Sequence, residues 1–322
     1  MILFRRLALV VAGIVVLVGA AAVVLWRGYE APGPLAESRT VVIPKHSGVE
    51  AIGALLAERG VIDNATIFAA GVWANGFARK LRAGEFAFPA RASPADVARH
   101  LAFGQPVMRR LTIAEGLTTT QVLALVAGAE GLEGTAPQGA GEGALFPETY
   151  SYTWGDGRAE MVARMKKTMD DTLAQAWAAR APDLAVTTPQ EALTLASIVE
   201  KETALAAERP MVSAVFQNRL KRGMKLQSDP TVLYAVTRGR GALDRKLTHA
   251  DLDTDSPYNT YANAGLPPGP IDAPGRAAIE AVLHPAQSDA LYFVADGTGG
   301  HVFAKTLEEH NRNVARWRSL QP

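Results

Sequence analysis

The chain of 322 residues contains no cysteine, and this absence excludes several kinds of chemistry. Without thiols the protein has no disulfide, no cysteine nucleophile and no thiolate-bound metal. The absence does not identify the compartment, because many exported proteins also lack disulfides. The six histidines are scattered, with no HExxH or similar spacing among them. We therefore expect neither a metal site nor a cofactor.

The chain also lacks an excess of charge of either sign. It has 33 basic and 32 acidic residues, which leaves a formal net charge of +1. Proteins that bind nucleic acid usually carry a basic excess, so we expect no nucleic-acid partner. Hydrophobic residues make up 48% of the chain, which is enough for one large core or two modest ones.

One long apolar run stands close to the N-terminus. Residues 7–26 contain no charge, and Arg5, Arg6 and Arg27 bracket them. Twenty helical residues at about 1.5 Å each span about 30 Å, which is the thickness of a bilayer core. The run ends on Trp26, an aromatic residue of the kind found at membrane interfaces. The pattern predicts a transmembrane anchor over residues 7–26.

A cleaved signal peptide is the alternative interpretation of this run. Its apolar region would normally be about 7–15 residues long, and this one is longer. The basic residues at positions 5 and 6 favour a cytoplasmic segment over residues 1–6. We therefore expect an uncleaved, single-pass protein of the inner membrane, with the residues that follow the run on the periplasmic or extracytoplasmic side.

Short strand and helix signals follow the apolar run. Residues 27–38 contain two prolines and are predicted to be a linker. Over residues 39–128 we expect strand–helix units. Their helices are predicted to begin with a capping box at Ser47, at Ser93 with Pro94 in the first helical position, and with a cap formed by Thr118 and Gln121. Small modules of this kind resemble LysM-like folds, which bind N-acetylated glycans. From the pattern alone, a spacer domain is the preferred interpretation.

A larger region follows a predicted loop over residues 129–144, which is rich in glycine, alanine and glutamate. Residues 160–179 show helical periodicity, and the methionines spaced by four in this segment favour core packing. The predicted fold class is α+β. An N-terminal transmembrane helix precedes a small module, and a larger mixed α+β catalytic domain covers residues 145–322.

The segment from Ala196 to Thr203, ASIVEKET, places two carboxylates at the end of an otherwise apolar helix that begins at Thr188. On a helical wheel both Glu200 and Glu202 border apolar neighbours. Desolvation disfavours the charged form of a carboxyl group, so either residue could keep its proton near neutral pH and act as a general acid. The wheel does not choose between them. The alternative is that both are surface glutamates paired with Lys201 or Arg209.

Later segments carry side chains suited to binding sugars. Residues 226–231 read LQSDPT, residues 256–261 read SPYNTY, and residues 265–270 read GLPPGP. Aromatic rings offer flat faces to pyranose rings, and amide side chains can bind an N-acetyl group through both a donor and an acceptor. A hairpin around residues 297–300 and a helix over residues 307–317 are predicted to close the domain.

These strings together resemble a known family, the endolytic murein transglycosylases of the MltG or YceG-like group. The matching strings are ASIVEKET, RLKRGMKLQSDPTVLYAV, YNTY, GLPPGPI, HPAQSDALYFVADGTGGHVFAKT and HNRNV. With the anchor and the LysM-like region, the resemblance covers nearly the whole chain. It is dense from about residue 145 onward and loose over residues 129–144.

The resemblance implies a lyase that cleaves the bond between N-acetylmuramic acid and N-acetylglucosamine in nascent peptidoglycan strands. It makes Glu202 the single catalytic acid and Glu200 a supporting or a structural residue. By motif position, the expected substrate contacts are Gln227, Asp229, Tyr258, Asn259 and Tyr261. The implied partners are peptidoglycan glycan strands, the inner membrane and cell-wall synthases.

Two other functions stay open. One is a muramidase-like hydrolase with Glu202 as the acid, in which Asp229 positions a water molecule. The other is a non-catalytic, membrane-tethered scaffold that binds peptidoglycan.

Overall fold

The structure is a computed structural model that describes residues 2–319, and it divides into two compact units. The first unit comprises Met1–Arg109, Glu130–Leu132 and Ser151–Asp156, and the second comprises Arg110–Ala129, Glu133–Tyr150 and Gly157–Pro322. Helices and short antiparallel strands occur together, which confirms the mixed α+β class. The boundary at Arg109 differs from the predicted one, because residues 110–128 belong to the second unit.

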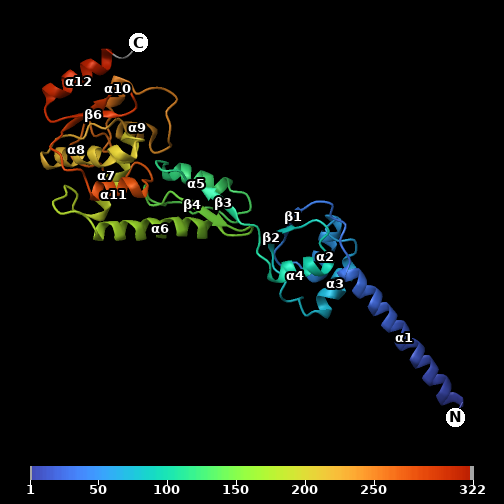
Figure 1. Cartoon of the computed structure of the whole chain (residues 1–322). Helices are drawn as coiled ribbons and strands as arrows, with labels where there is room; N and C mark the ends of the chain where they lie inside the picture. The colour runs from blue at the N-terminus through green and yellow to red at the C-terminus, as the bar shows by residue number, and fades with distance from the viewer. Residues whose placement is uncertain (1, 320–322) are drawn as a thin grey trace. The chain divides into compact units, whose positions relative to one another are not determined.

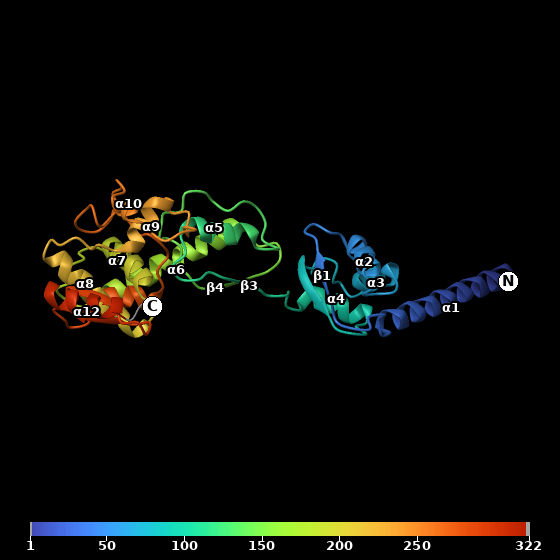
Figure 2. The ribbon, with the colours of Figure 1, turned by 90° about the horizontal axis from the view of Figure 1, so that it is seen from above.

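The first unit begins with the long apolar helix α1 (Ile2–Glu30). Its stretch Phe4–Glu30 is long and apolar enough to cross a membrane and is the one such helix among residues 2–319. In Figures 1 and 2, most of α1 stands clear of the rest of its unit, in accord with the exposure of its side chains. This helix is consistent with the predicted anchor.

Two antiparallel strands and three helices form the body of the first unit. The elements are β1 (Arg39–Ile43), α2 (Val49–Glu58), α3 (Ala65–Ala74), β2 (Gly84–Phe88) and α4 (Pro94–Phe103). Strands β1 and β2 pair with Val41 opposite Phe86, and a core that includes Ile43, Leu56, Phe68 and Leu101 lies between the strands and the helices.

The expected linker over residues 27–38 is part of this core. Tyr29 and Leu35 are buried within it. A Cβ atom at Gly71 would lie 2.2 Å from the Tyr29 ring, so the absence of a side chain there lets α3 approach the end of α1. These two side chains pack the segment against the first unit, while most of its other residues are exposed.

The helix starts predicted at Ser93 and Thr118 are confirmed, and each is closed by a capping box. The box predicted at Ser47 is wrong, because α2 begins after Gly48 without a side-chain cap. Glu50, the residue expected to complete it, instead accepts a hydrogen bond from the indole Nε1 of Trp73 at 3.2 Å. A tertiary contact has replaced the local one.

The second unit is mainly helical and is built around α7 (Pro189–Glu202). Its other helices are α5 (Thr119–Gly128), α6 (Arg158–Ala178), α8 (Arg209–Lys221), α9 (Asp229–Thr237), α10 (His249–Leu252), α11 (Arg276–Leu283) and α12 (Leu307–Ser319). The second unit holds most of strand β3 (Arg109–Thr112) and the first two residues of its partner β4 (Thr149–Tyr152). Strand β5 (Tyr292–Ala295) forms a hairpin with β6 (His301–Ala304). Helices α6, α8, α9 and α11 all contact α7.

The methionine stripe of α6 is buried, as the spacing predicts: Met161, Met165 and Met169 have almost no exposed surface. The core of the second unit includes Met169 together with the inner faces of α7, α8 and α11. Because α7 is enclosed on several sides, the position of its last turn is fixed by packing.

Candidate active site

Helix α7 is held at its start by the predicted capping box. The Thr188 hydroxyl accepts the Glu191 N–H at 3.1 Å, and the Glu191 carboxylate accepts the Thr188 N–H at 3.2 Å. Every residue from Ala192 to Val199 is buried. The helix ends at Glu202, with Thr203 extended as the C-cap. Glu202 is therefore the last residue of a firmly held helix.

Glu202 lines a cavity of about 460 Å³. This volume is within the range of sites that bind small ligands. The other lining residues come from α8, α9, α12, strand β5 and two loops: Arg219, Leu226, Gln227, Asp229, Tyr261, Phe293, Val294 and His310. The cavity thus brings together Glu202, Gln227, Asp229 and Tyr261, four of the residues selected from the sequence.

The Glu202 carboxyl group is half-buried and accepts a hydrogen bond from the Ser228 hydroxyl at 2.5 Å. Burial raises its pKa to about 7, and the nearby Asp229 adds to this rise. The Ser228 hydrogen bond and the electrostatic effects of His301 and Arg219 oppose the rise without cancelling it. A carboxyl group with this pKa can both give and take a proton near neutral pH.

Ser228 is held in place by the loop that contains the YNTY string. Its backbone N–H donates to Thr260 Oγ1 at 3.0 Å, and its carbonyl accepts the Thr231 hydroxyl at 2.7 Å. The neighbouring Gln227 has a positive φ of 51°, which is unusual for a residue other than glycine. The two loops therefore form one unit that places Ser228 against Glu202 and leaves Gln227 exposed at the cavity.

Asp229 is the first residue of α9, where the helix dipole favours a negative charge. Its carboxylate accepts a hydrogen bond from the Tyr261 hydroxyl at 2.6 Å. Burial raises the pKa of Tyr261 well above its usual range, and the hydrogen bond to Asp229 adds to the rise. The phenol therefore remains a donor at neutral pH and orients the Asp229 carboxylate.

Arg219 lines the same cavity, although the sequence analysis did not select it. Its guanidinium donates to the carbonyls of Leu291 at 2.6 Å and Leu226 at 2.7 Å, and it lies 5.3 Å from the centre of the Tyr292 ring. Burial lowers the pKa of Arg219, while the nearby Glu202 is one of the groups that raise it. The only sequence signal was its place in the RLKRGMKLQ string.

Glu200 lies in different surroundings from Glu202. Its carboxylate accepts a hydrogen bond from Arg209 at 2.7 Å and another from the backbone N–H of Gly275 at 3.0 Å. Only 6% of its side chain is exposed. Burial raises its pKa, and the bonds to Gly275 and Arg209 oppose the rise. This carboxylate joins α7 to the starts of α8 and α11.

Tyr258 and Asn259 do not line the Glu202 cavity. Asn259 is completely buried, and its amide donates to the carbonyls of Leu252 at 2.8 Å and Thr254 at 2.9 Å. Tyr258 packs against the ring of Tyr234, with 4.7 Å between the ring centres. The structure gives both residues a place in holding the loop rather than at the cavity surface.

Metal-ligating residues do not gather at this site. Among residues 2–319, no three side chains of histidine, aspartate or glutamate are grouped so that they could hold an ion.

Comparison with known proteins places this arrangement in context. The YceG-like family profile matches residues 41–316. An endolytic murein transglycosylase from Streptococcus pneumoniae is 34% identical over 86% of this chain and 58% of its own length. One from Bacillus subtilis is 42% identical over 55% of this chain and 48% of its own length. The chain thus spans about half the length of these curated relatives.

A solved structure agrees with the profile match. The crystal structure of a yceG-like protein from Listeria monocytogenes is 33% identical, with a TM-score of 0.52. The match covers 86% of this chain and 98% of that one.

Proposed function

The chain belongs to the YceG-like family, and from this premise we propose that it is an endolytic murein transglycosylase that cleaves peptidoglycan glycan strands. The observation that carries the proposal is the Glu202 carboxyl group, which lines the cavity and has a pKa raised to about 7. The names of the curated relatives support the activity.

In the proposed reaction, Glu202 first gives its proton to the glycosidic oxygen between N-acetylmuramic acid and N-acetylglucosamine. The bond from that oxygen to C1 breaks, and positive charge develops on the muramyl ring. The Glu202 carboxylate then takes the proton of the muramyl 6-hydroxyl while its oxygen bonds to C1. The products are a 1,6-anhydromuramyl end and a free N-acetylglucosamine hydroxyl, and no water is consumed.

One residue can perform both steps because its pKa is close to the working pH. General acid–base catalysis is most efficient under that condition. An ordinary glutamate, with a pKa of about 4.3, would seldom carry the proton needed for the first step at neutral pH. Ser228, whose hydroxyl lies 2.5 Å from the carboxyl oxygen, would hold the group in one orientation through both steps.

Three residues around the cavity are proposed to contact the sugar. Gln227 and the Asp229–Tyr261 pair present an amide, a carboxylate and a phenol at the same cavity as Glu202. Such groups bind hydroxyl and N-acetyl groups. Tyr258 and Asn259 would act on the substrate only through the loop that they hold, and Glu200 through the position of α7.

We propose further that α1 anchors the protein in the inner membrane, with residues 1–6 in the cytoplasm and the second unit on the opposite side. The length and composition of α1 support the anchor. A LysM-like role in glycan binding for the first unit, and partnership with cell-wall synthases, belong to the same proposal. An anchored enzyme would act on strands close to where they are made.

The test uses the full chain in detergent micelles with purified peptidoglycan sacculi, followed by mass spectrometry of the released glycans. We expect 1,6-anhydromuramyl ends, which are lighter than reducing ends by one water. The Glu202→Gln variant should release none. Absence of release by the wild type would favour a non-catalytic glycan-binding scaffold.

A hydrolase is the second candidate, because Asp229 lies in the same cavity as Glu202 and could position a water molecule. The same spectra decide between the two reactions. Release of reducing ends alone would replace the transglycosylase with a hydrolase, and the Asp229→Asn variant would then be inactive as well.

A further inference from the structure

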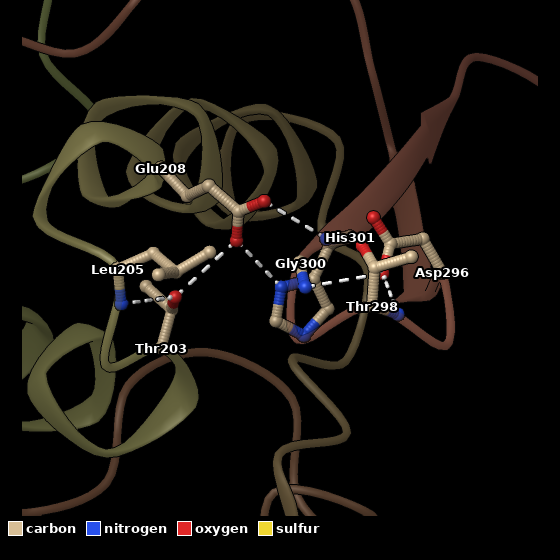
Figure 3. A network of polar contacts seen from close by, with 7 residues as sticks. All are labelled: Thr203, Leu205, Glu208, Asp296, Thr298, Gly300 and His301. Carbon is tan, nitrogen blue, oxygen red and sulfur yellow. Dashed lines mark hydrogen bonds and ion pairs between the residues drawn. The ribbon is translucent and has the colours of Figure 1, made fainter.

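The carboxylate of Glu208, which the proposed chemistry does not use, contacts the hairpin formed by β5 and β6. Glu208 ends the short 3₁₀ turn η1 (Ala206–Glu208) and precedes α8. Its Oε1 atom accepts the backbone N–H of His301 at 2.8 Å, and its Oε2 atom lies 2.7 Å from the Nδ1 atom of the same residue. Figure 3 shows the carboxylate between the end of α7 and the hairpin. Both oxygens of Glu208 are thus engaged by one residue of β6.

The ionisation state of this pair follows from the geometry. Burial raises the pKa of Glu208, but the hydrogen bonds from His301 outweigh it and leave the pKa lowered. An ionised carboxylate can only accept, so the Nδ1 atom of His301 must carry the proton in this contact. The carboxylate therefore fixes both the tautomer and the orientation of the imidazole ring.

The same carboxylate also reaches the residue that follows Glu202. The Thr203 hydroxyl donates to Glu208 Oε2 at 3.3 Å and accepts the Leu205 N–H at 3.0 Å (Figure 3). Thr203 is buried and is the C-cap of α7. These contacts close the turn directly after Glu202 and hold its backbone on the C-terminal side.

His301 connects this turn to strand β5, which lines the same cavity as Glu202. It pairs with Ala295 across the hairpin, and its ring meets that of Phe293 edge to face, with centres 5.3 Å apart. Phe293 and Val294 of β5 line the cavity together with Glu202. One carboxylate therefore contacts both the turn that follows Glu202 and the hairpin whose strand β5 lines the same cavity.

Contacts within the hairpin turn place His301 next to Glu208. Asp296 Oδ1 accepts the N–H groups of Thr298 at 2.7 Å and Gly300 at 3.1 Å, which stiffens the turn. A Cβ atom at Gly300 would lie 2.8 Å from Glu208 Oε1 and would push the carboxylate away. The backbone of Gly300 is outside the left-handed region, so close approach rather than conformational freedom requires glycine here.

We infer that Glu208 and His301 form a positioning pair, which sets the distance between the Glu202 carboxyl group and the Phe293–Val294 wall. This inference rests on the proposed function for its effect on catalysis. A shift of about 1 Å in a reacting group can reduce a rate about 100-fold. Loss of the pair should therefore lower kcat more than it raises KM, since neither residue lines the cavity itself.

The activity test measures release of anhydro ends from uncross-linked glycan strands by the full chain in detergent micelles. We expect Glu208→Gln, His301→Phe and Gly300→Ala each to lower kcat about 10- to 100-fold, with KM within about threefold of wild type. His301→Asn, which keeps a donor near the Nδ1 position, should recover most of the rate. Wild-type kcat in Glu208→Gln and His301→Phe would overturn the inference.

Two controls separate positioning from general damage. Gly128→Ala is the matched control for Gly300→Ala, because a Cβ atom there meets nothing within 4 Å. Glu308→Gln is the control for charge, since Glu308 pairs with Arg312 on the exposed face of α12. Both should keep wild-type kcat. The inference would be overturned if kcat fell equally in His301→Asn and His301→Phe and the unfolding temperature fell with it. The pair would then have only a structural role.

A measurement that does not depend on activity distinguishes this inference from the proposed function. Amide hydrogen exchange of the full chain should become faster in Glu208→Gln over residues 203–208 and 292–303, relative to Glu308→Gln. If the wild type released no anhydro ends, the proposed function would fail while the exchange result still decided whether the pair exists. Unchanged exchange in both segments would contradict it.

Discussion

Glu200 and Glu202 stand two residues apart on the last turn of α7, yet the structure gives them opposite surroundings. Glu200 is held by Arg209 and by the N–H of Gly275. Glu202 lines a cavity, where its hydrogen-bond partner is a neutral hydroxyl group. The comparison shows that burial alone does not distinguish the two carboxyl groups. The absence of a strong ionic partner, in a place that a substrate can reach, distinguishes the two.

The largest expected effect is on catalysis. We expect Glu202→Gln to lower kcat by about 10²- to 10⁴-fold, because the amide can neither give nor take the proton. Glu200→Gln should lower it far less, since its carboxylate does not line the cavity. Initial rates of anhydro-end release measure both. Equal losses in the two variants would erase the proposed distinction.

The second effect is on stability, and it falls on the other carboxylate. Glu200→Ala should lower the free energy of unfolding by about 3–5 kcal/mol, because it leaves the buried Arg209 without its nearest partner. The double variant Glu200→Leu with Arg209→Met should regain much of this loss, since it buries no lone charge. Urea unfolding measures these values. A loss below about 1 kcal/mol would show that the ion pair is not structural.

The third effect is a gain in the free energy of unfolding, in contrast to the loss expected for Glu200→Ala. The pKa of Glu202 is raised to about 7 in the folded protein, so its contribution to stability is complete below the unfolded pKa and declines as pH rises through 7. Glu202→Gln has no such decline. As pH rises from about 4.5 to 8, the free energy of unfolding of this variant should increase by about 3 kcal/mol relative to that of the wild type. Parallel stability curves for the two proteins would count against the raised pKa.

The smallest effect concerns Ser228. Its hydrogen bond lowers the pKa of Glu202, so Ser228→Ala should raise that pKa and move the alkaline limb of the kcat/KM profile to higher pH. The rate should fall about 10-fold as the carboxyl group loses its orientation. Ser47→Ala, in the other unit, is the control. If the alkaline limb of Ser228→Ala lay at the same pH as in the wild type, the hydroxyl would not contact the reacting carboxyl group.

The sequence predicted the features that local chemistry determines. The helix starts at Thr188, Ser93 and Thr118 are confirmed because each capping box closes within four residues. The box at Ser47 failed because the side chain expected to complete it, Glu50, bonds instead to Trp73, 23 residues further along the chain. A local sequence pattern fails to predict a contact when the side chain bonds to a residue that is distant in the sequence.

The site was predicted only in part, for the same reason. The ASIVEKET segment indicated two carboxylates, and the resemblance selected one of them. The contacts that separate them, from Arg209 to Glu200 and from Ser228 to Glu202, depend on how α8 and the loop before α9 pack on α7. Asn259 was selected for its polarity, but the backbone of its own loop uses its amide. Arg219 and His301 could be identified only from their positions in space.

The most direct test of the account is the titration of the Glu202 carboxyl group itself. Carbon-13 NMR spectra of glutamate-labelled wild type, compared with Glu202→Gln, would isolate its signal across the pH range. The account predicts a midpoint near 7, as burial in the cavity requires. A midpoint close to the ordinary glutamate value of about 4.3 would contradict it, because the group would then hold no proton to give at neutral pH.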